Sequence, residues 1–431
     1  MALKIDRLHP KNRLLAWAED RFPMLSFLAA HTTNYYAPKN LNIWYYFGVL
    51  AIVVLVNQLL TGIFLAMHYK PSATEAFASV EYIMRDVPWG WLLRYMHSTG
   101  ASLFFVVIYL HMLRGLLYGS FKKPRELVWL LGMVIFLILM AEAFMGYVLP
   151  WGQMSYWGAK VIINLFSAIP VVGDDLTQWI MGDFVPGDAT LNRLFALHVV
   201  ALPIALLALV TIHILALHEM GSNNPDGVEI HAIEDAKGHP VDGIPFHPYY
   251  TVEDTLSVGV FLLIAAFLIF FEPTVGGLFL EHDNFVEANP MITPEHIKPV
   301  WYFTSFYAML RLVPDKLVGV LVMGAAIGVL FLLPWIDRGQ VKSIRYRGTG
   351  YKVALGVFVL SFVALGLVGI GAVSALLTRL MGPGADISHL EHWIGRLFLA
   401  GYFGFFAFVW VYTHFGFERT KPVPSRVHYD G

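Results

Sequence analysis

The sequence contains no cysteine among its 431 residues. This absence excludes disulfide bonds, cysteine-ligated iron–sulfur clusters and thioether-linked haem within the chain, so any such group must belong to a partner. Charge is also scarce, because only 14% of the residues are Asp, Glu, Lys or Arg, against 57% hydrophobic residues. Soluble domains usually carry about 25% charged residues. The composition indicates a membrane protein, and the formal net charge of −2 gives no reason to expect nucleic acid as a partner.

Long apolar runs predict eight membrane-spanning helices. Each run is close to the roughly 20 residues that a helix needs to cross the hydrocarbon core. The predicted spans cover residues 42–68, 92–117, 127–149, 192–218, 254–272, 317–336, 351–379 and 394–415. The expected fold class is an all-α integral membrane protein. Residues 1–41 are polar and amphipathic and lack the apolar core of a secretory signal, so we expect an N-terminal segment outside the membrane.

The distribution of basic residues predicts the orientation of these spans. Lys and Arg are concentrated in the N-terminal tail, in the connections after the second and sixth spans, and at the C-terminus. With eight spans these segments lie on one side of the membrane, which the positive-inside rule makes the cytoplasm. Both termini are expected there. The two long connections on the outer side are residues 150–190 and 273–316, and ordered loops of this length are usually functional.

Four histidines lie inside apolar spans, and they form two pairs. His97 and His111 are fourteen residues apart in the second span, and His198 and His213 lie in the fourth. Fourteen residues of helix rise roughly 21 Å and make almost four turns, so His97 and His111 share a face near opposite edges of the membrane. An ionisable group at this depth usually faces a partner, a cofactor or a water-filled path. Two such helices side by side place one histidine couple near each edge of the membrane. Two axial imidazoles at one level suit a six-coordinate haem iron.

Residues near the histidines are also those expected around a cofactor bound at each histidine couple. Arg94 and Arg114 lie three residues outside the two histidines of the second span, where each could bind a haem propionate by a charge-assisted bond or extend to the lipid headgroups. Glycines repeat the fourteen-residue spacing in the neighbouring spans, as Gly48 and Gly62 in the first and Gly132 and Gly146 in the third. Glycine lets a flat macrocycle lie against backbone, and ordinary helix packing is the alternative explanation.

The first four spans, residues 42–253, are therefore predicted to form a di-haem four-helix bundle. Residues 254–431 are predicted to form a C-terminal four-helix lobe.

The alternative class is an ion-coupled transporter whose histidines relay protons. A transporter needs polar residues along a continuous path. The helix centres between the histidines are apolar, which favours electron transfer.

Five motifs connect the sequence with a known family: RYMHSTGAS, GYVLPWGQMSYWGA, HEMGSNNPDG, FHPYYTVEDT and PVWYFTSFYAMLR. They resemble cytochrome b, the membrane core of ubiquinol:cytochrome c oxidoreductase (the cytochrome bc1 complex, complex III), and the resemblance covers nearly the whole chain. Eight fused spans favour the bacterial respiratory type over the photosynthetic relative, which is split into two chains.

The resemblance implies two non-covalent b haems (protohaem IX). His97 and His198 would bind the outer, low-potential haem, and His111 and His213 the inner, high-potential haem. It also implies an outer pocket that oxidises ubiquinol and sends one electron inward through the haems. The residues implied at this pocket are Phe144, Tyr147, Gly158, Pro299 and Tyr302.

A second pocket, for quinone reduction, is implied at the cytoplasmic side, with His218, Ser222 and Asp254. The residues themselves agree with this assignment, because His218 ends the fourth span and Asp254 opens the fifth. A histidine and a carboxylate can pass two protons to a reduced quinone. The alternative is that both are solvated polar groups at helix ends.

The resemblance further implies that the chain is one subunit of an enzyme. Its partners would be a Rieske iron–sulfur protein, which takes the second electron, cytochrome c1, and a second copy in a homodimeric complex. The location would be the bacterial inner membrane, where the reaction builds a proton gradient. A stand-alone di-haem quinone oxidoreductase is the alternative, but the long outer loops and the PVWY segment favour the full complex.

Three positions depart from the family pattern. His198 and His213 are fifteen residues apart instead of fourteen, with the extra residue before Pro203. Fifteen residues overshoot four turns by about 60°, which a local bulge near the proline could absorb. Val300 replaces the usual acidic residue of the outer pocket, and Glu253 stands where many relatives have lysine.

Valine cannot accept a proton, so quinol oxidation at the outer pocket needs another acceptor. Glu295 is the nearest carboxylate upstream of Val300, and His296 and Tyr302 are further possibilities. The alternative for Glu295 is a solvated charge at a helix N-terminus.

Overall fold

The computed structural model describes residues 7–428. Residues 1–6 and 429–431, the ends of the predicted N-terminal segment and C-terminal lobe, lie outside the described residues. Within 7–428, eight helical segments are long and apolar enough to cross a membrane, as predicted. They are η1 (Ile43–Tyr45) with α3 (Phe47–Ala66), α5 (Gly90–Tyr118), α6 (Glu126–Val148), α9 (Asp188–Ala196) with η3 (Leu197–Ala201) and α10 (Leu202–Met220), α11 (Phe246–Phe271), α13 (Lys316–Ile336), α14 (Thr349–Gly369) and α16 (Ser388–His414).

The first lobe is built on the four-helix bundle of α3, α5, α6 and α10. Helix α3 packs along α5, α6 packs along α10, and α5 contacts α6. Helix α11 also contacts α3 and α5, although the predicted boundary at residue 254 placed it in the C-terminal lobe. The reason is a short antiparallel pair in which β1 (Tyr36–Pro38) bonds to β2 (Gly243–Pro245). Because β1 precedes α3 and β2 precedes α11, this pair holds the two helix starts together.

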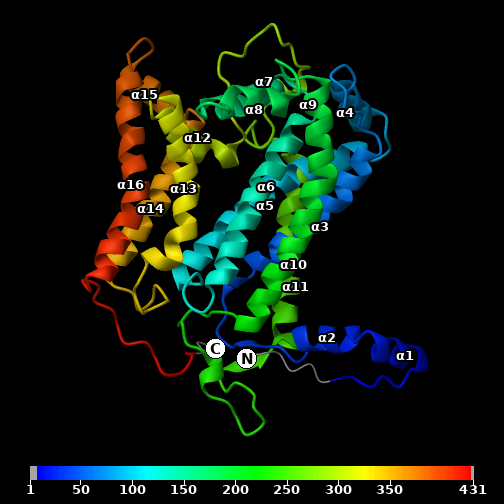
Figure 1. The fold of residues 1–431 in the computed structure, drawn as a ribbon, viewed down its shortest axis with the longest axis vertical. Coiled ribbons are helices and arrows are strands. Elements are labelled where there is room, and N and C mark those ends of the chain that lie inside the picture. The colour runs from blue at the N-terminus through cyan, green and yellow to red at the C-terminus, as the bar shows by residue number, and fades with distance from the viewer. Residues whose placement is uncertain (1–6, 429–431) are drawn as a thin grey trace.

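The second lobe contains α13, α14 and α16 with the short helix α12 (Thr304–Arg311). Helix α14 packs between α12 and α16, and α13 contacts α6 of the first lobe. Figure 1 shows the two lobes side by side. A buried ionic cluster also joins them, because Lys122, after α5, lies 2.7 Å from Asp337, which pairs with the fully buried Arg347. Both partners of each pair are desolvated, so removing one would leave a costly unpaired charge.

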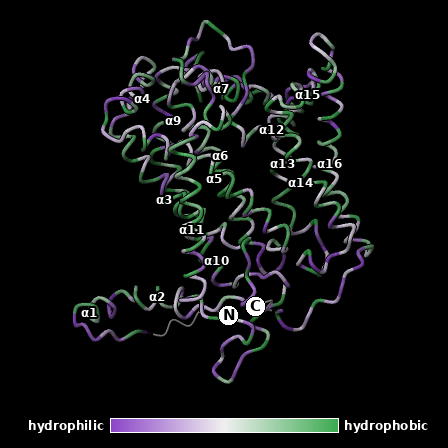
Figure 2. Tube along the Cα trace, turned by 180° about the vertical axis from the view of Figure 1, so that it is seen from behind, coloured by the Kyte–Doolittle hydropathy of each residue, from purple (hydrophilic) through white to green (hydrophobic). Residues whose placement is uncertain are grey.

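The two ends of the molecule differ. One end carries short helices that lie in the connections between spans, and we call it the loop end. These helices are α4 (Ala76–Arg85), α7 (Gln153–Ile163), η2 (Asn164–Ala168), α8 (Gly173–Met181), η5 (His282–Phe285), η6 (Trp301–Phe303), α12 and α15 (Ala372–Met381). Hydrophobic residues fill the helices between the two ends, and hydrophilic ones gather at the ends (Figure 2).

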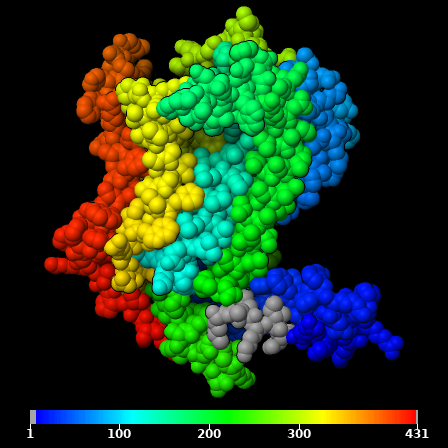
Figure 3. Space-filling view, viewed as in Figure 1, coloured from blue at the N-terminus to red at the C-terminus, as the bar shows by residue number. Residues whose placement is uncertain are grey.

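The first and the last described residues lie at the opposite end, which we call the terminal end (Figure 1). It also carries α1 (Arg13–Arg21), α2 (Met24–His31), the β pair and η4 (Ile230–Ala232). Helices α1 and α2 extend sideways from the bundle (Figure 3). An even number of spans brings the start and the end of the described chain to one end of the molecule.

The seventh span is shorter than predicted. The apolar run suggested one helix over 351–379, but α14 ends at Gly369 and α15 starts at Ala372. Gly371 between them has a φ of +84°, a left-handed conformation that ends the helix and redirects the chain. Hydropathy alone does not register such a break, because the residues on both sides are apolar.

Candidate functional site

The structure brings the four membrane histidines together in the predicted couples. The ring centres of His97 and His198 are 6.2 Å apart, and those of His111 and His213 are 6.5 Å apart. An imidazole nitrogen binds a first-row metal at about 2.0–2.1 Å, and its ring centre lies about 1.1 Å behind it, so two axial rings on one iron are about 6.2 Å apart. Both couples therefore have the separation that a six-coordinate haem iron requires.

Each of the four predicted glycines faces one of these histidines. A side-chain carbon built on Gly48 would lie 3.6 Å from the ring of His111, and one on Gly62 would lie 3.2 Å from His97. On Gly132 it would lie 3.3 Å from His213, and on Gly146 it would overlap the ring of His198. The glycines thus leave room for the imidazoles.

The rings at the loop end are held by hydrogen bonds on their Nδ1 atoms. His97 Nδ1 lies 2.9 Å from Thr61 Oγ1, and His198 Nδ1 lies 2.9 Å from the Glu142 carbonyl oxygen and 3.1 Å from its Oε1. These partners occupy Nδ1 and leave Nε2 of each ring to face the other ring. A partner on the second nitrogen typically fixes the orientation of a metal-binding imidazole.

The rings at the terminal end have a different environment. Within residues 7–428, the Nδ1 atoms of His111 and His213 make no hydrogen bond of good geometry, although the carbonyl of Val128 is close to His213. The buried Nε of Arg114 and hydroxyl of Tyr45 also lack partners among these residues. The Arg114 guanidinium lies over the Tyr45 ring, 4.9 Å from its centre. Buried polar atoms are normally satisfied, so these two donors fit an anionic group such as a haem propionate.

The extra residue between His198 and His213 is absorbed as predicted. Residues Leu197–Ala201 form a π-helical turn, η3, directly before α10. A π turn bonds each residue to the fifth one along and so takes up one residue without breaking the helix. Pro203 cannot donate the next backbone hydrogen bond, which favours an irregularity at this point. His198 therefore faces His97 despite the longer spacing.

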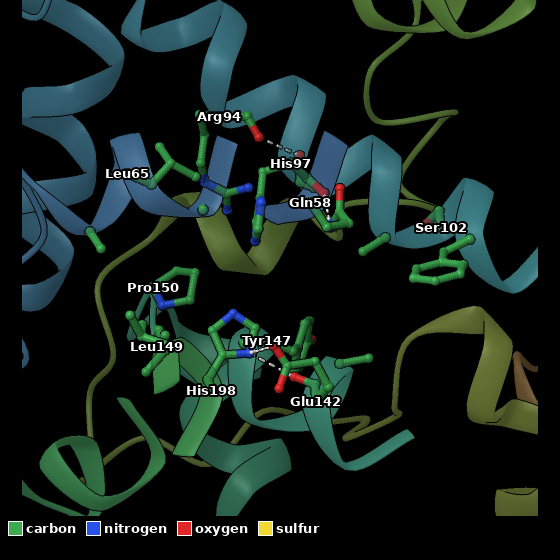
Figure 4. A pocket seen from close by; sticks show the side chains of 18 of the residues that line it. Gln58, Leu65, Arg94, His97, Ser102, Glu142, Tyr147, Leu149, Pro150 and His198 are labelled. Atoms are coloured by element: carbon green, nitrogen blue, oxygen red, sulfur yellow. Dashed lines mark hydrogen bonds and ion pairs between the residues drawn. The ribbon is translucent and has the colours of Figure 1, made fainter. Parts of the chain in front are cut away.

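One cavity at the loop end joins the His97–His198 couple to the predicted quinol pocket. It is lined by Arg94, both histidines and Glu142 on the bundle side, and by Tyr147, Asn284, Val300 and Tyr302 toward the loops. Figure 4 shows His97 with Arg94 on one side of the cavity and His198 with Glu142 and Tyr147 on the other. The Tyr302 ring is fixed by stacking on Phe105, with ring centres 4.0 Å apart.

The other residues predicted for the quinol pocket lie around this cavity in different ways. Gly158 is buried behind Tyr147, where an added side-chain carbon would lie 3.7 Å from that ring. Phe144 packs in the apolar cluster of α7 and the loops, and Pro299 is half-buried before Val300. Glu295 is exposed and is not among the residues that line the cavity. The structure therefore does not bring Glu295 to the pocket.

A buried acid in the same loop was missed. The carboxylate of Glu281 accepts hydrogen bonds from Tyr147 Oη at 3.1 Å and Asn284 Nδ2 at 3.2 Å. Burial raises the pKa of Glu281 above its ordinary value. No local pattern separates it from the exposed Asp283 and Glu287, because its burial depends on how residues 273–316 fold over α6 and α7.

The residues predicted for the quinone pocket lie at the terminal end but are not all in contact. The ring of His218 stacks on Tyr35, with centres 4.5 Å apart, and its Nδ1 lies 2.9 Å from Nδ1 of His31. The Tyr35 hydroxyl accepts a hydrogen bond from the backbone of Ser222. No hydrogen bond or ion pair joins Asp254 to His218 among residues 7–428. The partners His31 and Tyr35 come from the N-terminal segment, where spacing gives no indication of this contact.

Comparisons with known proteins agree with this geometry. Two family models match the chain, "Cytochrome b/b6/petB" over residues 32–221 and "Cytochrome b(C-terminal)/b6/petD" over residues 287–384. "Cytochrome b" from Allochromatium vinosum is 58% identical over 427 residues, which cover 97% of this chain and 99% of the relative. The chain belongs to the cytochrome b family.

Further similarities concern the assembly in which such proteins work. "Cytochrome b/c1" from Bradyrhizobium diazoefficiens is 44% identical, over 97% of this chain and 57% of that relative. A solved structure of "Hyperthermophilic respiratory Complex III" superposes with a TM-score of 0.82 at 34% identity and covers 93% of this chain. The chain is thus a respiratory electron-transport protein of the complex III type that binds haem b, and the transporter alternative is wrong.

Proposed function

We propose that the chain binds two b haems, one in each histidine couple, and exchanges electrons with quinones at two pockets. The haems would supply one-electron carriers stacked between the two ends. His97 and His198 would hold one haem, and His111 and His213 the other. Arg94 and Arg114 would bind the propionates at opposite ends. The observation that carries this proposal is the loop-end cavity, which is lined by the His97–His198 couple and by Tyr147 and Tyr302 together.

At the loop end the residues of the chain would bind and orient a quinol. Tyr302, stacked on Phe105, forms a rigid wall, and the Tyr147 hydroxyl points to a buried carboxylate. Apolar neighbours such as Val300 exclude water from the ring. The cavity places the quinol beside the histidine couple, so one electron would enter the chain there. The other would go to a Rieske iron–sulfur partner and on to cytochrome c1, the partner that the name of the Bradyrhizobium relative suggests.

At the terminal end His218 and Asp254 would supply protons to a quinone that is being reduced. His218 is linked to His31 and stacked on Tyr35, so more than one protonatable group serves that pocket. The terminal end would face the cytoplasm of a bacterial inner membrane, because the basic segments lie there. Proton uptake at this end and release at the other would build a proton gradient in a homodimeric complex.

Asp254→Asn in the intact complex tests the assignment of the two pockets. We expect slower reoxidation of the terminal-end haem, because a proton donor for the quinone is lost, and unchanged haem reduction by quinol at the loop end. Both rates are measured by stopped-flow haem absorbance. Asp235→Asn is the matched control, since Asp235 is an exposed carboxylate in the connection before α11. If Asp254→Asn instead blocked haem reduction by quinol at the loop end, the sides would be assigned wrongly.

A further inference from the structure

Glu281 is a buried acid at the edge of the loop-end cavity. It lies outside the spans, directly before η5, and only 8% of its surface is exposed. Its Oε2 accepts hydrogen bonds from Tyr147 and from Asn284, and Asn284 Nδ2 also donates to the Tyr147 hydroxyl at 3.0 Å. The three side chains form a closed triangle. Among residues 7–428 no Lys or Arg is in hydrogen-bond contact with this carboxylate. A buried carboxylate without such a partner is expensive, so its position calls for a functional explanation.

The triangle connects Glu281 with the interior of the cavity. Tyr147 and Asn284 both line the cavity, together with Val300 and Tyr302. Asn284 is itself fixed, because its Oδ1 accepts a hydrogen bond of 2.7 Å from the Ser155 backbone. With its amide oxygen engaged, Asn284 must donate to Tyr147. The hydroxyl proton of Tyr147 is thereby directed to Glu281.

We propose that Glu281 accepts a proton from a quinol bound in the loop-end cavity, through the Tyr147 hydroxyl. The inference rests on the proposed function, and it supplies the acceptor that Val300 cannot be. The quinol O–H bond breaks and its proton joins the Tyr147 oxygen, while the Tyr147 hydroxyl proton moves to Glu281 Oε2. The hydroxyl is restored and the carboxylate becomes a carboxylic acid. The two electrons leave to the one-electron acceptors of the proposed function, and the second proton leaves the quinol separately.

The surroundings suit a group that takes up a proton and releases it. Burial raises the pKa of Glu281, whereas hydrogen bonds from Tyr147 and Asn284 and the charge of Lys298 oppose the rise. The titratable or charged groups that act on it are Tyr147, Lys298 and Tyr302. A base works best with a pKa near the working pH, so a raised carboxylate pKa is favourable. The next residues, His282 and Asp283, are exposed, so the proton has a short way to water.

Two other carboxylates fit the role less well. Glu295 is exposed and does not line the cavity. Glu142 does line it, but its Oε1 lies 3.1 Å from Nδ1 of His198 and is engaged in holding that ring. Glu281 is the acid that a cavity tyrosine contacts directly.

The test is Glu281→Gln in the intact complex, with quinol:cytochrome c turnover measured across pH. Loss of an acid or base typically costs 10²–10⁴-fold, and since the second proton has its own route we expect a loss of about tenfold or more. Wild-type turnover should fall at low pH, because Glu281 becomes protonated and can no longer accept a proton. This fall at low pH, the acid limb of the pH profile, should be absent in Glu281→Gln. Glu281→Asp should retain a limb at reduced rate, and adding Val300→Glu to Glu281→Gln should restore part of the rate. The exposed Glu287→Gln is the matched control.

Further measurements separate this role from a structural one. Haem content of Glu281→Gln should equal that of the wild type, which shows a folded subunit. Tyr147→Phe should also remove the acid limb. The double variant Tyr147→Phe/Glu281→Gln should turn over no more slowly than the slower of the two single variants, because both residues act in one relay. Independent, multiplicative losses would contradict the relay.

Two results would overturn the inference and leave the proposed function intact. One is wild-type turnover with an unchanged pH profile in Glu281→Gln or, if that variant fails to assemble, in Tyr147→Phe. The other is loss of the acid limb in Glu295→Gln but not in Glu281→Gln. If instead the wild-type complex reduced no haem with quinol, the proposed function itself would fail.

Discussion

The two histidine couples have almost the same ring separation but different surroundings. At the loop end both rings are bonded through Nδ1, to Thr61 and to Glu142. At the terminal end neither ring has such a bond of good geometry among residues 7–428, and buried donors of Arg114 and Tyr45 also lack partners there. Hydrogen-bonded ligands are oriented by the protein before the cofactor enters. The terminal-end couple is expected to depend more on the haem itself for its order.

The helices that carry the couples also differ. His97 and His111 lie on the uninterrupted helix α5, whereas the segment from His198 to His213 begins with the π turn η3. The same ring alignment is thus reached with fourteen residues on one side and fifteen on the other. We therefore expect the loss of one residue to be tolerated at η3 and not within α5.

Single-residue deletions in the two helices should have the largest and most different effects on haem content. Deleting Val106 from α5 would turn His97 by about 100° relative to His111, so one haem should be lost. Deleting the exposed Val200 from η3 would convert the π turn to α-helix and restore fourteen-residue spacing, so both haems should be kept. Haem content per chain, from the reduced-minus-oxidised spectrum, measures the difference. Equal losses in both deletions would show that η3 does not buffer the spacing.

Alanine at the four glycines should reveal which ring is packed most tightly. Gly146→Ala would overlap the His198 ring and should destabilise the subunit by about 1–3 kcal/mol or remove the loop-end haem, because overpacking forces a shift. Gly48→Ala is the matched control, since its added carbon would lie at an ordinary contact distance of 3.6 Å from His111. Thermal stability and haem content are the readouts. A tolerated Gly146→Ala alongside a damaging Gly48→Ala would reverse the order read from the structure.

Thr61→Val should have the smallest effect and sharpen the contrast in ring support. It removes the hydrogen-bond partner of His97 Nδ1 and keeps the side-chain volume. Loss of such a partner typically weakens metal binding by about 10–100-fold, so the loop-end haem should dissociate more readily during purification. The terminal-end haem should be unaffected, as two separate steps in a redox titration would show. An equal change in both haems would mean that the Thr61 bond has no local role.

Structural features that depend on the helical period could be predicted from the sequence. The number of spans follows from the lengths of the apolar runs. The pairing of His97 with His198 and of His111 with His213, and the glycines opposite them, follow from helical repeats. Periodicity also requires that one extra residue be absorbed between His198 and His213, and the family pattern placed the bulge before Pro203. Helix geometry is local, so spacing transfers directly into space.

Features that depend on long connections could not be predicted in this way. Glu281 is buried only because residues 273–316 fold over α6 and α7, and nearness in sequence pointed to the exposed Glu295. The pairing of His31 with His218 joins residues 187 positions apart. Helix α11 joined the first lobe through the β1–β2 contact, which two short, weakly patterned segments form.

The haem content of wild-type, His198→Leu and His213→Leu chains shows directly whether each histidine couple holds one haem. Two low-spin b haems per wild-type chain are expected, and each substitution should remove one of them, with different spectral signatures for the two losses. His218→Leu is the control and should keep both haems, because its ring contacts His31 and Tyr35 rather than another membrane histidine. Two full haems in the His213→Leu chain, or one lost in His218→Leu, would contradict the arrangement of two stacked histidine couples.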